Sequence, residues 1–174
     1  SYQANLTIYP DFTNLVQPPI ADEFKKLAGS VAIIPNSKML SKQNENTLWK
    51  TRYIQVLVTI IETLEAQGKS VFLLNHEGQS DDAICQKINQ QLKRSLDIVA
   101  PRSALQVKAI IGQCVLTICS RFHGCVSSLS QGVPCIATSW SHKYEELFSE
   151  YSQGDNLLSP ELTSTELNKF TLRV

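Results

Sequence analysis

The chain has 174 residues, which is enough for one domain with a full hydrophobic core or for one domain with part of another. Its 16 lysines and arginines balance 16 aspartates and glutamates, so no overall field draws the chain to nucleic acid or to an anionic membrane. The longest apolar run is too short to cross a bilayer and the N-terminus has no signal-peptide pattern, so we expect a soluble, cytoplasmic protein without a transmembrane segment.

Cysteine and histidine usage gives no sign of a metal site or of a disulfide framework. The five cysteines form no CxxC pair and lie among apolar neighbours, which is typical of small buried thiols in a reducing compartment. They are Cys85, Cys114, Cys119, Cys125 and Cys135. Because the three histidines are also scattered, the sequence predicts no bound metal and no cofactor.

The first residues have the pattern of a short strand followed by a linker. Residues 5–9 are strand-like, and the proline-containing segment after them has the composition of a turn. The sequence opens without Met just before this stretch, so we expect it to be a piece of a longer protein. We therefore predict that residues 1–22 connect to an absent N-terminal domain and that residues 23–174 form one domain.

From residue 30 onward, short apolar runs alternate with segments of helical periodicity. Strands are expected at 30–35, 69–75, 97–100, 114–119 and 134–138, and helices at 49–64, 80–92, 103–113, 122–132 and 142–151. Gly68 ends the first helix, and Ser80 is expected to cap the second, with Asp81 and Asp82 in its first turn. This alternation predicts an α/β fold with a doubly wound parallel sheet of the Rossmann-like type.

In such sheets ligands bind at the carboxyl ends of the strands, so the residues that follow each strand deserve most weight. After the predicted strands the sequence places these polar or small residues: Asn36, Ser37 and Lys38; Asn75, His76 and Glu77; Ser120, Arg121, His123 and Gly124; Ser139, Ser141, His142 and Lys143. If the fold is correct, they meet at one edge of the sheet.

The turn at Arg121 is suited to an anion. Apolar residues fill the core-facing stripe of the helix that follows it: Phe122, Cys125, Val126 and Leu129. His123 is left at the edge of that stripe, in a first turn with free backbone N–H groups, and Arg121 adds a fork that matches a carboxylate or phosphate. Gly124 would let a ligand approach the backbone. Equally, Arg121 could cap a neighbouring helix while His123 binds a carbonyl group.

Two further residues have both a functional and a structural interpretation. His76 follows a strand and could reach a ligand over the sheet edge, or it could simply pack within its loop. Lys143 lies in the first turn of a helix, where the dipole disfavours a cation, so either an anion is nearby or the lysine is solvated. The chain has no GxGxxG, GxxxxGK[ST], GxSxG or HExxH, so the usual dinucleotide, P-loop, serine-hydrolase and zinc-protease fingerprints are missing.

Three stretches together resemble the polysaccharide pyruvyl transferase family. SRFHGCVSSLSQGVPCIATSWSHKYEEL, residues 120–147, is similar to its C-terminal signature of an S-R-aromatic/Leu-H segment, a helix, G-V-P, an apolar strand and a later lysine. VFLLNHEGQSDDAICQKI, residues 71–88, resembles the family's histidine loop and acidic helix start, and YPDFTNLV, residues 9–16, its P-D segment before the second domain. The resemblance covers about residues 7–150.

The resemblance implies two Rossmann-like domains that face each other across a cleft, as in the GT-B glycosyltransferases, with residues 23–174 as the C-terminal, donor-binding domain. It implies transfer of pyruvate from phosphoenolpyruvate to two sugar hydroxyls as a ketal, in exopolysaccharide or cell-surface glycan biosynthesis. The implied partners are phosphoenolpyruvate, a glycan or lipid-linked sugar acceptor, and the missing N-terminal domain. Alone, this chain would be an enzyme with an incomplete active site.

The family's R-x-H pattern also implies roles for individual residues. Arg121 and His123 would be catalytic, Arg121 as part of an anion clamp and His123 as general acid or as a group that orients the phosphate. Lys143 would neutralise the leaving phosphate, and His76 would contact donor or acceptor. Ser120, Gly124 and Ser141 complete the expected substrate-binding set.

Two other functions fit the same sequence pattern. A GT-B glycosyltransferase donor domain would bind a nucleotide sugar at the same edge, and it would need a glutamate to grip the ribose, for which the chain offers Glu145 and Glu146. A non-catalytic module of the same fold would bind an anion or sugar without turnover. Retention of Arg121, His123 and Lys143 argues against a decayed site.

Overall fold

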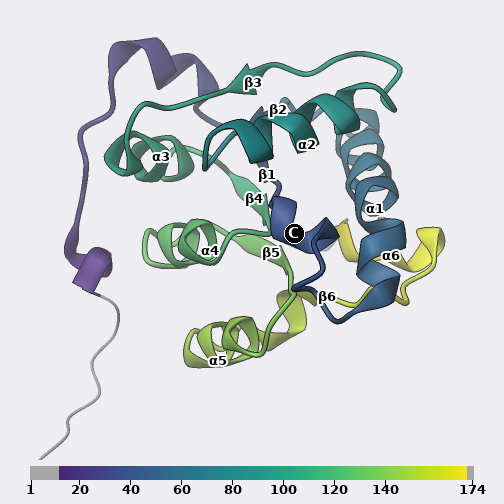
Figure 1. The fold of residues 1–174 in the computed structure, drawn as a ribbon. Coiled ribbons are helices and arrows are strands. Elements are labelled where there is room, and N and C mark those ends of the chain that lie inside the picture. Colours follow the sequence, from purple (N-terminus) through teal and green to yellow (C-terminus); the bar gives the residue numbers. More distant parts are fainter. Residues whose placement is uncertain (1–11, 172–174) are drawn as a thin grey trace, which may run out of the picture.

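The computed structural model describes residues 12–171, which form a six-stranded parallel sheet covered by helices on both faces (Figure 1). The strand order is β3-β2-β1-β4-β5-β6, the order of doubly wound Rossmann folds, which confirms the predicted fold class. The strands are β1 Val31–Ile34, β2 Val71–Leu74, β3 Ile98–Val99, β4 Leu116–Cys119, β5 Cys135–Thr138 and β6 Leu157–Leu158. The predicted strand at residues 5–9 lies outside the described residues.

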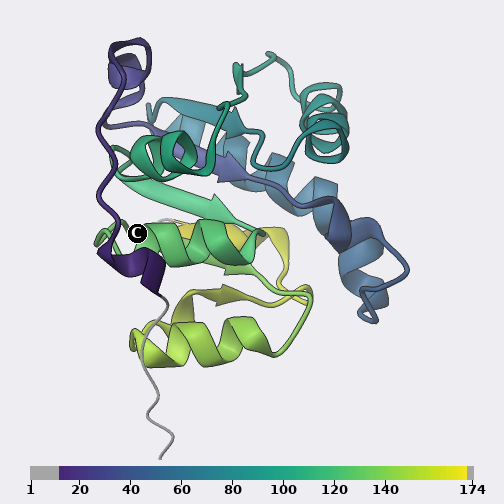
Figure 2. The ribbon, with the colours of Figure 1, turned by 60° about the vertical axis from the view of Figure 1, so that its left-hand side comes forward.

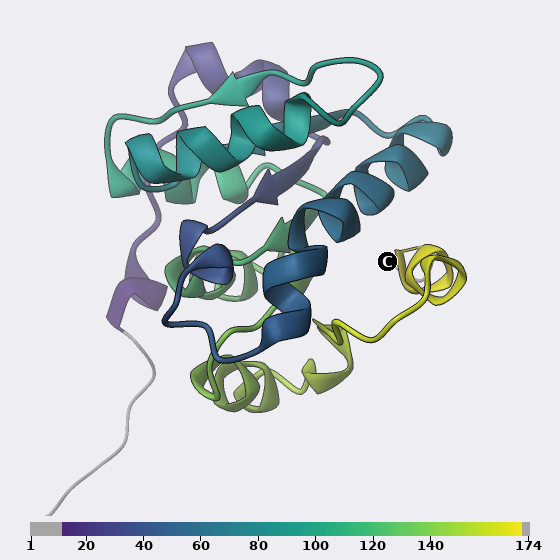
Figure 3. The same ribbon diagram turned by 45° about the vertical axis from the view of Figure 1, so that its right-hand side comes forward.

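Two helical layers sandwich the sheet. The helices are α1 Thr47–Ala66, α2 Gln79–Asn89, α3 Ala104–Ile111, α4 Phe122–Leu129, α5 Lys143–Glu150 and α6 Ser164–Thr171. Helices α3, α4 and α5 cover one face (Figure 2), whereas α1, α2 and α6 cover the other (Figure 3). Alternate residues of β1 enter the two cores, with Ile33 in the α1 core and Ile34 in the α4 core, because successive side chains of a strand point to opposite faces.

Two details of the predicted elements were wrong. Ser80 does not cap α2, since the helix begins one residue earlier and its N-cap position is Gly78, with φ +70° and ψ −150°. Few L-residues adopt that conformation, so glycine, rather than a capping side chain, sets the start of this helix. The structure also contains β6 and α6, which were not predicted because their residues are too polar or too few to give a periodic signal.

A capping box marks the start of α6 and could have revealed it. The Thr163 backbone N–H donates to the Glu166 carboxylate at 2.8 Å, and the Glu166 N–H donates to the Thr163 hydroxyl at 3.3 Å. Arg52 of α1 donates to the carbonyl of Leu162 at 2.7 Å and fixes the approach to this helix. The described helices include none that is both long and apolar enough to cross a bilayer.

The segment before β1 packs on the domain. It contains η1 Phe12–Leu15 and η2 Asp22–Leu27, and Leu27 is a buried member of the α4 core. The amide of Asn14 donates to the Tyr151 hydroxyl at 3.1 Å, and the Lys108 ammonium donates to the Thr13 carbonyl. These contacts place residues 13 and 14 against the helical layer of α3, α4 and α5.

One buried hydroxyl cluster joins the carboxyl ends of neighbouring strands. Ser120, directly after β4, accepts hydrogen bonds on its hydroxyl from Tyr53 of α1 and from Thr138 of β5, both at 2.7 Å. The Tyr53 hydroxyl in turn accepts from the Asn36 backbone N–H at 2.9 Å. The Ser120 carbonyl accepts from the Asn36 amide and the Tyr144 hydroxyl, both at 2.9 Å. The loops after β1, β4 and β5 are therefore held in one fixed arrangement.

Tyr53→Phe tests this cluster. The substitution leaves the buried Asn36 N–H without its acceptor and Ser120 without one donor, so we expect the free energy of unfolding to fall by about 1–3 kcal/mol. Urea denaturation measures the change. Tyr151→Phe, which removes a less buried hydroxyl contact, is the matched variant and should cost less. Equal losses in the two variants would contradict a special role for the cluster.

Candidate functional site

A cavity of about 270 Å³ opens at the carboxyl edge of the sheet. Residues that follow β1, β2, β4 and β5, in the connecting loops and in the first turns of α4 and α5, line it: Asn36, Lys38, His76, Glu77, Arg121, Phe122, His123, Trp140, Lys143 and Tyr144. The structure therefore brings His76 and Lys143 together with Arg121 and His123, although His76 lies 45 residues before Arg121 and Lys143 lies 20 residues after His123. Ser120, Gly124 and Ser141 are not among the lining residues.

The Arg121 guanidinium is anchored by a buried carboxylate. Its Nε donates to Asp81 Oδ2 at 2.9 Å and an Nη to Asp81 Oδ1 at 2.5 Å, while the other Nη contacts the Glu77 carboxylate. Asp81 is fully buried and also accepts the Ser37 backbone N–H at 3.3 Å. Burial disfavours the charged guanidinium, but the hydrogen bonds and charge of Asp81 outweigh it and raise the pKa of Arg121. The fork predicted to be free for a ligand is thus largely occupied by the protein's own carboxylates.

Asp81 is the residue whose importance the sequence did not reveal. Its position in the first turn of α2 was explained by the helix dipole, and that explanation required no partner. Its partner Arg121 lies 40 residues away, at the N-cap of α4, and only the sheet topology brings the two together. Removing either side chain would leave a buried charge without its counter-ion, which typically costs about 3–5 kcal/mol.

His76 and His123 differ in environment. His76 is half-buried, and burial together with the nearby Arg121 charge lowers its pKa, so the imidazole is neutral at pH 7. His123 is exposed at the first turn of α4 and packs edge-to-face on Phe122, with ring centroids 5.7 Å apart. Both also line an adjoining, mostly apolar cavity of about 190 Å³ beside α3. The two imidazoles thus line two adjoining cavities.

Aromatic rings hold the Lys143 ammonium at the cavity. Its Nζ lies 4.5 Å from the Phe122 ring centroid, 5.5 Å from that of Trp140 and 6.0 Å from that of Tyr144. Phe122 and Tyr144 themselves pack edge-to-face, with centroids 5.6 Å apart. The attraction of the ring faces for a cation accounts for a lysine at the N-terminus of α5, where the helix dipole opposes it. Neither a bound anion nor full solvation is needed to explain its position.

The remaining predicted residues, Ser120, Gly124 and Ser141, lie in other parts of the fold than the cavity wall. Ser120 is fully buried in the hydroxyl cluster. Gly124 is buried in α4, and a Cβ there would lie 2.6 Å from the sulfur of Cys119, so the missing side chain allows α4 to approach β4 closely. The Ser141 hydroxyl is buried and has no hydrogen-bond partner among the described residues. All five cysteines are free and buried, as expected.

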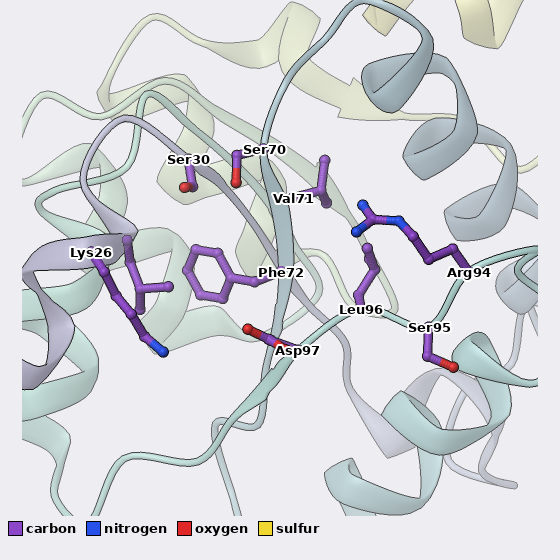
Figure 4. A pocket seen from close by; sticks show the side chains of 10 residues that line it. Lys26, Ser30, Ser70, Val71, Phe72, Arg94, Ser95, Leu96 and Asp97 are labelled. Atoms are coloured by element: carbon purple, nitrogen blue, oxygen red, sulfur yellow. The ribbon is translucent and has the colours of Figure 1, made fainter.

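A second polar cavity, of about 230 Å³, lies at the opposite edge of the sheet (Figure 4). Its wall includes Ser30 and Ser70, the residues directly before β1 and β2. Its one arginine, Arg94, is bound to Glu65 at 2.6 Å. Ligands of parallel α/β sheets bind at the other edge, so this cavity is not the candidate site. The described residues contain no cluster of ligands that could hold a metal ion.

Fold and cavity together define a Rossmann-like α/β domain with basic and imidazole groups at the carboxyl edge of its sheet. The sequence profile of the polysaccharide pyruvyl transferase family matches residues 1–142, and the chain belongs to this family. No curated protein matches it significantly.

One similar solved structure is the UDP-forming α,α-trehalose-phosphate synthase from Burkholderia xenovorans, a GT-B glycosyltransferase. It is 9% identical, with a TM-score of 0.54, over 87% of this chain and 38% of that protein. At this identity the likeness shows the fold alone, which is that of one half of a GT-B enzyme. The chain spans well under half the length of that protein.

Gly124→Ala tests the packing of α4 on β4. The added methyl group meets the Cys119 sulfur, so we expect a loss of about 1–3 kcal/mol in the free energy of unfolding. Gly154→Ala is the matched control, because its added methyl group meets nothing within 4 Å, and its effect should stay within about 0.5 kcal/mol. Denaturation of both variants in urea measures the difference. Wild-type stability in Gly124→Ala would contradict the close contact.

The lowered pKa of His76 predicts a pH effect on stability. In the unfolded chain this histidine takes up a proton near its ordinary pKa of 6.5, whereas the folded protein does so only at lower pH. As the pH falls below about 6.5, the unfolded state therefore binds more protons and gains stability. We expect the free energy of unfolding of wild type, relative to His76→Gln, to decline on acidification and to level off below the folded pKa. Parallel pH curves for the two proteins would contradict the lowered value.

Proposed function

We propose that this chain forms the donor side of a pyruvyl transferase active site. In the proposed reaction a pyruvyl group passes from phosphoenolpyruvate to two hydroxyls of a sugar, giving a ketal in exopolysaccharide or cell-surface glycan biosynthesis. The observation that carries the proposal is the single cavity that combines Arg121, Lys143 and the two imidazoles, in a chain of this family.

Phosphoenolpyruvate presents a carboxylate and a phosphate on the same carbon, so its site needs two neighbouring anion-binding groups. Arg121 supplies a guanidinium whose orientation Asp81 fixes, and we assign it to the carboxylate. Lys143 is held across the cavity by the aromatic rings, and we assign it, with Lys38 and the free N–H groups of α4, to the phosphate.

We assign the exposed His123 as the acid that supplies the proton required by the reaction. Protonation of the methylene carbon uses the electrons of the C=C bond and leaves the adjacent carbon electrophilic. A sugar hydroxyl attacks that carbon, and phosphate leaves with the electron pair of its C–O bond. The second hydroxyl then attacks and closes the ketal; of the two protons that the hydroxyls lose, one restores the acid and the other passes to the released phosphate. His76, neutral at pH 7, can accept a proton from an attacking hydroxyl.

The acceptor is assigned to a second domain, which agrees with the coverage of 38% of the GT-B neighbour. We propose that residues 1–22 connect to that domain and that residues 23–174 bind the donor. By itself the chain is then an incomplete active site that binds phosphoenolpyruvate weakly, in the millimolar range. Five free, buried cysteines fit a reducing compartment and support action in the cytoplasm.

A nucleotide-sugar donor fits the cavity less well. Glu145 and Glu146, the glutamates available to grip a ribose, are exposed and lie outside the cavity lining. Titration of the chain with phosphoenolpyruvate and, in parallel, with uridine diphosphate distinguishes the two donors. Tighter binding of uridine diphosphate would favour the glycosyltransferase function.

His123→Gln tests the proposed acid. The imidazole is exposed, so the fold should be unaffected, and loss of general acid catalysis should lower kcat in the full-length enzyme by about 10²- to 10⁴-fold. His142→Gln is the matched control, because His142 is exposed at the start of α5 and does not line the cavity. Phosphate release from phosphoenolpyruvate in the presence of acceptor measures turnover. Unchanged kcat in a folded His123→Gln enzyme would refute the assignment.

A further inference from the structure

Arg121 binds two carboxylates of its own chain that differ sharply in burial. Asp81 is 0% exposed and takes Nε and one Nη in the two-point geometry that matches a guanidinium fork. The Glu77 side chain is 68% exposed and contacts only the remaining Nη. Glu77 lines the cavity, whereas Asp81 does not. Asp81 therefore anchors Arg121, and Glu77 covers the Nη of Arg121 on the side of the cavity.

The Nη that Glu77 contacts is the part of Arg121 with which a ligand carboxylate could pair, because Asp81 binds Nε and the other Nη and the Arg121 side chain is only 12% exposed. We infer that Glu77 is an internal competitor of the donor carboxylate: its side chain occupies the ligand position on Arg121 in the empty site and leaves it when the donor binds. This inference rests on the proposal that the cavity takes a carboxylate-bearing donor.

The local structure makes departure of Glu77 easy. An exposed ion pair contributes little to stability, since water solvates both partners well. Glu77 lies in the short loop between β2 and α2, next to Gly78 with its positive φ, and no secondary structure fixes its side chain. Loss of this contact leaves Arg121 oriented by Asp81, so the fork remains in place for the ligand.

The charges around Arg121 explain how Glu77 affects the binding of an anion. With Glu77 bound, two carboxylates face one guanidinium, so Arg121 offers no net attraction to an anion. When a ligand carboxylate replaces Glu77, the released side chain returns to water, where its charge is solvated. Glu77 therefore weakens the binding of any carboxylate at Arg121 by a similar small factor. A ligand with a second anionic group gains further attraction from other groups of the cavity, such as Lys143.

Glu77→Gln tests whether Glu77 competes with a ligand for Arg121 or helps to hold Arg121 in place. We expect the variant to bind phosphoenolpyruvate, and acetate as a simple carboxylate, about two- to fivefold more tightly than wild type, the size expected of an exposed ion pair. NMR titration of the labelled chain, followed at the Nε–H signal of Arg121, gives the affinities. Glu145→Gln is the matched control: it removes an exposed carboxylate that does not line the cavity and should leave both affinities unchanged.

A second readout follows the displacement itself. In wild type, saturation with phosphoenolpyruvate should move the side-chain carboxylate ¹³C signal of Glu77 and leave that of Asp81 in place. Unchanged or weaker binding in Glu77→Gln, a stationary Glu77 signal, or loss of the fold in the variant would each overturn the inference. If phosphoenolpyruvate binds neither protein but acetate binds the variant more tightly, Glu77 is confirmed as a competitor for Arg121, and phosphoenolpyruvate is refuted as the donor.

Discussion

The candidate site depends on one buried ion pair, that of Asp81 with Arg121. It joins the start of α2 to the N-cap of α4, and through the Ser37 N–H it also reaches the loop after β1. A carboxylate that is fully buried must be paired, so these segments cannot separate without a large cost in free energy. The position of the guanidinium at the sheet edge is therefore set before any ligand arrives.

Around that pair, other groups of the cavity have supports of their own. The hydroxyl cluster of Ser120, Tyr53 and Thr138 fixes the strand ends beneath the cavity. Aromatic rings hold the Lys143 ammonium, while burial keeps His76 neutral. His123 alone is exposed and free of such constraint among the imidazoles of the cavity. Fixed cations with one freer acid–base group suit a reaction that holds a dianion still while a proton moves.

The sequence predicted the sheet because parallel strands buried on both faces give continuous apolar runs, as in β1 and β2. It also predicted that Arg121, His123, His76 and Lys143 would meet, because the carboxyl ends of parallel strands share one edge. It could not predict that Gly124 packs against a sulfur, which depends on how closely α4 approaches β4, or that Ser120 is buried, which depends on its contacts with α1 and β5. The short β6 and polar α6 gave no periodic signal.

By itself, then, the sequence determined the order of strands and helices from β1 to α5, the edge at which polar residues gather and the family resemblance, since each depends on local pattern along the chain. Only the tertiary structure decided which charges pair. Arg121 could have been a free anion clamp, and its fork is instead held by Asp81 and covered by Glu77. Ion pairing depends on distance and burial between segments 40 or more residues apart, and no local pattern in the chain encodes either.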